Sequence, residues 1–230
     1  KSIALEGANT LALQGGYINI PQDNLPVNPL LPFSNRLQVF NNDALEVPYW
    51  FYETANGIQK TQVPSKQDME NELEDYISSN LNNCLNNFTE FQDYQVSGFN
   101  NIKTEVTIND NNIFIKVLSK LNVEYKGLEQ EFDKFLITLD VPLGKLYNKA
   151  REILDTENKN NFFEELTYDM MVVYDEIPLS KTEFSCEQRI WSEEQVKKDF
   201  KKIVNKNINA INLENTNTRK YYSLPINNIP

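Results

Sequence analysis

Residues 104–117 read Thr-Glu-Val-Thr-Ile-Asn-Asp-Asn-Asn-Ile-Phe-Ile-Lys-Val, and this stretch decides the fold. Apolar or β-branched side chains occupy every second position on both sides of the polar turn Asn109–Asn112, which is typical of paired strands with one buried face. Two more runs with the same period follow, at residues 121–125 and 135–141. Because the connections are short, we predict one antiparallel meander between about residues 102 and 141.

Helical patterns lie on both sides of this meander. Ser65 and Asp68 form an Asp variant of the capping box and open the clearest helix. Its apolar residues recur at steps of three and four: Met69, Leu73, Tyr76, Ile77, Leu81, Cys84, Leu85 and Phe88. We expect this helix to pack across the sheet through Leu73, Ile77, Leu81 and Leu85. The fold class is therefore α+β, an antiparallel β-meander packed with several amphipathic helices.

The second half of the chain contains three further helical patterns. Pro142 fits the first turn of one helix, because its missing N–H needs no partner there. The polar residues 156–161 separate this helix from another between Phe162 and about Tyr174. Residues 192–195 form a capping box before the last helix, whose inward side chains are predicted to be Val196, Phe200, Ile203 and Val204.

The domain organisation follows from these patterns. We predict a single α+β domain over residues 1–213, with residues 65–213 as its helix and sheet core and residues 214–230 as a C-terminal tail. Residues 1–20 contribute a helix and a strand, and residues 21–64 contribute a Pro-rich segment and a hairpin.

Three details of the first 64 residues are specific predictions. Residues 1–13 have a helical pattern and Tyr17–Ile20 is predicted to be extended. Val47–Glu53 is predicted to be one strand, paired with residues 58–63 around the turn Asn56-Gly57, where both residues favour positive φ. The helix at residues 1–13 has neither an initiator Met nor an N-cap, so we expect the natural polypeptide to begin upstream, with this helix continuing a membrane anchor. The printed chain has no run of eighteen apolar residues.

Composition excludes several kinds of chemistry. The chain has no His and only two Cys, so it cannot form His-based nucleophile systems or a four-ligand Cys/His zinc site. We predict no catalytic residues, no cofactor and no transition metal. A formal charge of -11 and a sequence pI near 4.6 oppose binding to phosphate backbones, so nucleic acid is not an expected partner.

Two local patterns have a functional interpretation and a structural one. The run Tyr49, Trp50, Phe51 and Tyr52 is a candidate binding platform for a sugar or an apolar partner, but alternating aromatics of a strand also fill a core. The acidic residues between Asp68 and Asp75 suit a hard cation such as calcium. Since they lie on the polar side of an amphipathic helix, we interpret them as a solvated face.

The cysteines and one asparagine are candidate modification sites. Cys84 lies on the apolar stripe of its helix and Cys186 lies in a polar stretch. They are disulfide candidates, with each other or with a cysteine upstream, and a free buried thiol at Cys84 is the alternative. Asn87-Phe-Thr89 is the one N-glycosylation acceptor pattern and has meaning only in an exported protein.

Several segments recur together in a known group of proteins: residues 13–18, 47–53, 84–88, 142–147, 183–186 and Trp191. In these the chain resembles a group of uncharacterised proteins of small-genome (DPANN) archaea, over most of its length up to about Leu213. The resemblance implies a domain anchored in the membrane through an upstream helix, behind a pilin-like leader, and facing outward at the cell surface. It also implies an upstream cysteine as a partner for Cys84. Neither feature lies within the printed residues, and we expect both to precede them in the natural polypeptide; the group has no established activity.

These observations lead to three functional hypotheses. The first is a non-enzymatic extracytoplasmic domain with a structural or binding role at the cell surface and a protein or glycan partner. The second is a carboxylate-based hydrolase acting on surface polysaccharide, for which a pocket with two carboxylates, one with a raised pKa, would be evidence. The third is a subunit of a pilus-like filament.

Overall fold

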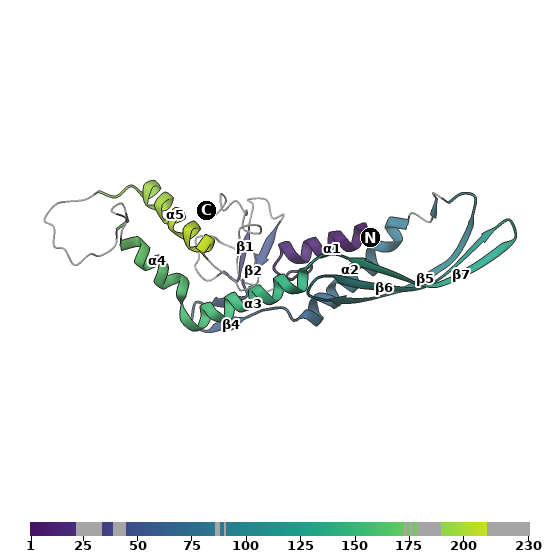
Figure 1. Cartoon of the computed structure of the whole chain (residues 1–230), viewed down its shortest axis with the longest axis horizontal. Coiled ribbons are helices and arrows are strands. Elements are labelled where there is room, and N and C mark those ends of the chain that lie inside the picture. The colour runs from purple at the N-terminus through teal and green to yellow at the C-terminus, as the bar shows by residue number, and fades with distance from the viewer. Residues whose placement is uncertain are drawn as a thin grey trace. The chain divides into compact units, whose positions relative to one another are not determined.

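A computed structural model describes residues 1–21, 34–38, 45–85, 88–89, 91–172, 174, 177–178 and 190–210. The chain divides into two compact units, residues 1–148 and the residues from 149 onward, and each is described by itself (Figure 1). Helices and antiparallel sheets together confirm the predicted α+β class. The single domain over residues 1–213 stays a prediction.

The predicted meander is confirmed as a three-stranded antiparallel sheet of β5 (Gln95–Ile108), β6 (Ile113–Tyr125) and β7 (Leu128–Leu139), in that order. Its boundaries differ from the prediction. The runs at 113–117 and 121–125 are one strand, because a register shift against β7 between Leu118 and Leu121 interrupts the pairing without ending the strand. Lys126 and Gly127 then turn the chain with φ of 50° and 78°, which matches the two-residue hairpin geometry.

The core of unit 1 lies between the sheet and two helices, α1 (Ser2–Leu13) and α2 (Lys66–Leu85). The capping box is confirmed, since Ser65 N donates to Asp68 Oδ2 (3.0 Å) and Asp68 N donates to Ser65 Oγ (3.1 Å). Leu73 and Ile77 are buried as predicted, and Leu81 packs against them partly exposed. The buried apolar cluster comprises Ala4, Ala8, Leu11, Met69, Leu73, Ile77, Val106, Ile108, Ile113, Ile115, Val117, Leu139, Leu143 and Tyr147.

Glycine allows α1 and α2 to approach closely. A Cβ built on Gly7 would lie 2.6 Å from Leu73 Cδ1 and 2.8 Å from Tyr76 Cδ1. Any larger residue would therefore displace the side chains of α2 that fill the core.

The predicted strand at Tyr17–Ile20 is wrong, because no strand of the described residues pairs with it. The backbone N–H groups of Ile18 and Asn19 donate instead to the Glu72 carboxylate of α2, at 2.8 Å for Asn19. A carboxylate satisfies two adjacent donors here, so the segment needs no neighbouring strand.

The predicted strand over Val47–Glu53 is also wrong, because it is two short strands. β2 (Glu46–Pro48) pairs with β1 (Arg36–Gln38), a strand that was not predicted within the Pro-rich segment. β3 (Phe51–Glu53) pairs with β4 (Gln59–Thr61). The break falls at Tyr49, whose N–H donates to the Asn35 carbonyl (2.8 Å). The β3–β4 hairpin confirms the Asn56-Gly57 turn, although only Gly57 has positive φ.

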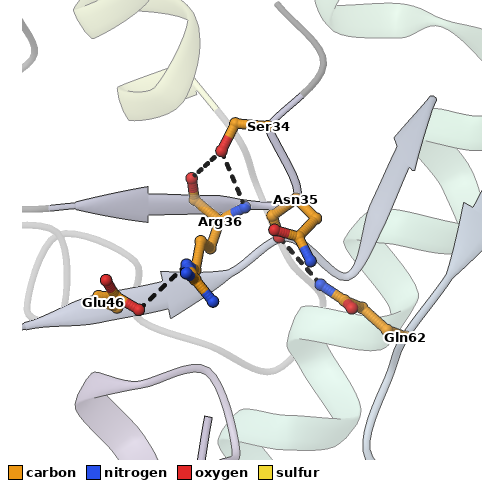
Figure 2. A network of polar contacts seen from close by, with 5 residues as sticks. All are labelled: Ser34, Asn35, Arg36, Glu46 and Gln62. Carbon is orange, nitrogen blue, oxygen red and sulfur yellow. Dashed lines mark hydrogen bonds and ion pairs between the residues drawn. The ribbon is translucent and has the colours of Figure 1, made fainter. Parts of the chain in front are cut away.

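Polar contacts fix the β1–β2 pair (Figure 2). Arg36 Nε lies 3.1 Å from Glu46 Oε2, and both side chains are mostly buried. Ser34 Oγ donates to the Arg36 carbonyl (2.7 Å), and Gln62 Nε2 donates to the Asn35 carbonyl (2.9 Å). The second of these bonds ties β1 to the residue that follows β4.

Three helices are described in the second half of the chain: α3 (Leu143–Asn160), α4 (Phe162–Val172) and α5 (Glu193–Ala210). The predicted break over residues 156–161 is shorter than expected, because α3 continues to Asn160 and only Asn161, with φ of 49°, separates it from α4. The described residues contain no helix with the length and apolar character needed to cross a bilayer.

The predicted inward face of α5 is partly wrong. Ile203 is fully buried, but Phe200 is 41% exposed, and the other buried residues among the described side chains of α5 are Asp199 and Asn207. Polar contacts explain this: Asp199 accepts from Gln195 and Lys202, and Asn207 Nδ2 donates to Thr167 Oγ1 of α4 (2.8 Å). The capping bond from Gln195 N to Ser192 Oγ is present at 3.4 Å.

Candidate functional site

The aromatic run that the sequence nominated does not form one surface. The indole N–H of Trp50 donates to the Gly15 carbonyl (2.7 Å), and its ring meets Tyr147 edge-on at 5.8 Å. Tyr52 is buried, Phe51 is half-buried, and Tyr49 is 37% exposed, with its pKa raised by burial. Two of the four rings therefore pack inside unit 1, and a binding role for the run stays a prediction.

The interpretation of the acidic stretch on α2 as a solvated face is wrong for most of its carboxylates. Glu70 Oε1 accepts from the Ile108 N–H and Glu74 Oε1 accepts from the Val106 N–H, both at 2.8 Å. These two donors lie on the side of β5 that has no neighbouring strand in the part of the chain that the structure describes. Glutamates one helical turn apart thus cover the β5 edge, which explains their residue type. Within the described ranges, no three acidic or Cys side chains converge as metal ligands.

The candidate modification sites fall at the limits of the described chain. The backbone of Cys84 lies in the last turn of α2, but its side chain is outside the described structure, as are Asn87 and Cys186. Disulfide formation and glycosylation at these positions stay predictions.

The meander continues past α1 and α2 (Figure 1), and a chain of aromatic rings joins its strands to Phe88, Phe91 and Tyr94. Each ring contacts the next, with centroids 4.9–6.5 Å apart, which is the range of favourable aromatic pairs. The tightest pair is Tyr94 stacked on Tyr125 at 4.9 Å. We call this set the aromatic cluster; in order of contact it comprises Tyr125, Tyr94, Phe91, Phe88, Phe99, Phe135 and Phe132.

The aromatic cluster is open to solvent. Phe91 is 53% exposed, and Tyr94, Tyr125 and Phe132 are each more than one third exposed. Leu128 of β7, which is in register with Tyr125, is also exposed, and within the described residues no strand pairs with the outer edge of β7. Large exposed apolar patches are uncommon on monomers and mark contact sites.

The outer half of the sheet also has a polar groove of about 590 Å³. Residues that are in register across the sheet point to the same face. Their side chains form two rows on that face, and the groove lies between the rows. The rows are Gln95, Glu124 and Glu129, and Ser97, Asn122 and Glu131. No basic side chain lines the groove, so it is unsuited to an anionic partner.

A pair of carboxyl groups meets in unit 2, where α3 joins α4. Glu157 is hydrogen-bonded to Glu164, and its Oε2 accepts from the Phe163 N–H (3.1 Å). Burial, followed by the bond to Glu164, raises the pKa of Glu157 to about 7, whereas the same bond lowers the pKa of Glu164. A shallow hollow of about 480 Å³ beside the pair is lined by Glu164, Glu165, Tyr168 and Asp169.

Sequence reasoning had missed the aromatic cluster as a unit. It placed Phe88 on the apolar stripe of the helix and Tyr125 and Phe135 on strands, and left the other members unassigned. The available signal was the density of Phe and Tyr between residues 88 and 99, just where the helical pattern ends. Knowing that these rings meet β6 and β7 required the register of the sheet.

Comparison of the chain with models of known protein families finds no match, and neither curated proteins nor solved structures match it. The resemblance to archaeal surface proteins therefore stays a prediction, and the function has to be argued from the residues.

Proposed function

We propose that this chain is a non-enzymatic, extracytoplasmic binding domain that holds a protein partner on its aromatic cluster at the cell surface. The observation that carries the proposal is the continuous chain of seven rings, four of them more than one third exposed. Aromatic side chains dominate the energetic centres of protein interfaces, because each buries a large area with little loss of conformational entropy.

The composition of the surface favours protein over the other partner classes. Five of the seven rings are Phe, and the exposed residue in register with Tyr125, Leu128, is aliphatic, so most of this surface offers no hydrogen bonds to sugar hydroxyls. Glu129 and Glu131 of β7 line the polar groove on the other face of the same strand, and their charges oppose nucleic acid and anionic lipid. A protein partner that presents apolar side chains fits the aromatic cluster. A second copy of the chain, as in a filament, belongs to the same class.

The hydrolase is the second candidate, because one observation favours it. Glu157 and Glu164 are two carboxyl groups of which one has a pKa raised to about 7, as a general acid requires. The two groups are in direct hydrogen-bond contact, however, whereas glycosidases separate theirs by roughly 5–9.5 Å to accommodate the substrate or a water. Because the two carboxyl groups lie closer together than this mechanism requires, we rank the hydrolase second.

Site-specific photo-crosslinking tests the proposed function. Benzoylphenylalanine replaces Phe91 in the full chain, in the cells that make the protein, and Tyr168 of α4, which is also well exposed, is the matched control position. We expect a protein adduct from position 91 and none from position 168. A polysaccharide adduct from position 91 would show that the partner is a glycan and not a protein. Equal adducts at both positions would contradict a role for the aromatic cluster.

A further inference from the structure

The meander has one covered face and one exposed face. On β6 every second side chain from Ile113 to Leu121 is buried and belongs to the covered face, which packs on the core of unit 1. The side chains between them, from Phe114 to Glu124, are all at least partly exposed. No described side chain of β5 or β7 that shares this second face is buried either. We call it the exposed face, and its composition decides what can pack on it.

Charges on the exposed face are sorted along the strands. The glutamates that wall the polar groove, Glu124, Glu129 and Glu131, form an acidic end next to the turn at residues 126–127. Closer to the core lies a basic band, which comprises Lys103, Lys116, Lys120 and Lys134, with Glu105 between two of them at 3.4 Å from Lys103 and 2.9 Å from Lys116. Four lysines against one glutamate give the basic band a formal charge equal and opposite to that of the acidic end.

The register of the sheet fixes the spacing of these two regions. Glu129 is in register with Glu124 of β6, and Lys134 is in register with Leu118 of β6. These two rows are therefore six residues apart along β6, or about 20 Å at roughly 3.3 Å per residue. A line across the strands near Leu121 separates them, so the face is acidic on one side of this line and basic on the other.

From this pattern we propose that the exposed face of the meander docks a second copy of the chain, face to face and with antiparallel strands. A two-fold axis that crosses the strands near Leu121 places β7 of one copy over β7 of the other. Glu129 of each copy then lies opposite Lys134 of its partner copy, and Glu131 lies opposite Lys120. The contact is isologous, so each of these pairs occurs twice. Sheets pack face to face about 10 Å apart, a gap that the long side chains of Lys and Glu span.

The charge pattern selects this arrangement over the other two-fold packing of the same face. An axis parallel to the strands would place each row over the same row of the second copy, with acidic end on acidic end and basic band on basic band. Like charges in contact cost several kcal/mol, whereas the antiparallel arrangement joins only opposite charges. Complementarity of the exposed face to itself is thus the reason why a second copy fits it.

The overlap is short, because it runs only from the row of Lys134 to the row of Glu129. Interfaces of small area are weak and transient, and exposed ion pairs each contribute little. The net charge of -11 also repels the copies over longer distances. An ionic strength of about 0.1 M screens that repulsion beyond roughly 10 Å and weakens direct contacts less. We therefore expect a reversible dimer at high protein concentration under this condition.

Sedimentation equilibrium of the full chain, up to about 1 mM protein at an ionic strength of about 0.1 M, tests the inference. Glu129→Lys and Lys134→Glu change exposed residues, so both variants should fold like the parent by circular dichroism. Each should self-associate at least about tenfold more weakly than the parent, because like charges then meet across the interface. An equimolar mixture of the two variants should regain the affinity of the parent chain. In that mixture each contact between the two variants again joins a lysine to a glutamate.

Asp75→Lys is the matched control, since it makes the same change of charge as Glu129→Lys at an exposed position on α2. It should leave the association unchanged. A parent chain that stays monomeric would overturn the inference, as would a mixture that associates no better than either variant alone. Dimers that persist in both charge variants but weaken in the double variant Phe91→Ser and Phe132→Ser would move the second copy to the aromatic cluster. These outcomes do not decide the proposed function, because Phe135 and Tyr125 of that cluster alternate with the side chains of the exposed face.

Discussion

Leu73→Asp is expected to unfold unit 1. Leu73 has no exposed surface, sits in the middle of α2 and contacts both α1 and the sheet core. The substitution removes an apolar side chain and places an unpaired carboxylate in a site without polar partners, so we expect a loss of about 5 kcal/mol. Chemical denaturation followed by circular dichroism measures it.

The matched control lies on the opposite side of the same helix. Asn71→Asp adds the same charge at an exposed position two residues away, and the free energy of unfolding should change by no more than about 0.5 kcal/mol. Equal stability of Leu73→Asp and Asn71→Asp would contradict the packing of α2 on the sheet.

Replacing both Glu70 and Glu74 with Ala is expected to have the second largest effect. Each change leaves a backbone N–H of β5 without its acceptor, at Ile108 and at Val106, two residues that are themselves buried. A hydrogen bond to a charged group contributes about 2 kcal/mol when its loss leaves a buried donor unsatisfied, so the pair should lose about 3–4 kcal/mol. Denaturant titration gives the free energy of unfolding, and amide exchange should accelerate at Val106 and Ile108.

Two comparisons separate the hydrogen bonds from the charge. The double substitution Glu70→Gln and Glu74→Gln keeps an oxygen acceptor at each position, and we expect it to lose less than half as much stability. Asp75→Ala removes an exposed charge from the same helix and should leave stability unchanged. If the alanine and glutamine pairs were equally stable, the carboxylates would not be covering the edge of β5.

The sequence predicted those parts of the fold that depend on short-range patterns. The alternation at residues 104–117 and the Ser65–Asp68 capping box both specify local geometry, and both are confirmed. The Lys126-Gly127 turn was missed because β7 begins at Leu128 with mostly polar residues, and the predicted apolar alternation begins only at Phe135.

The incorrect predictions share a physical cause, which is a partner distant in sequence. Glu70, Glu72 and Glu74 looked solvent-facing on a helical wheel, yet each binds backbone N–H groups of another segment. Tyr17–Ile20 looked like a strand, but a carboxylate more than fifty residues away satisfies its donors. The aromatic cluster likewise unites three strands with Phe88, Phe91 and Tyr94, which lie between α2 and β5.

Calorimetric titration with the partner cross-linked from position 91 tests the central claim most directly. The full chain is compared with the double variant Phe91→Ser and Phe132→Ser, which removes two exposed rings, and with Tyr168→Ser as the matched control. Because exposed aromatics are the main anchors in such interfaces, we predict that the double variant binds at least about tenfold more weakly, with an unchanged melting temperature. Affinity equal to that of the parent chain and of Tyr168→Ser would contradict the account.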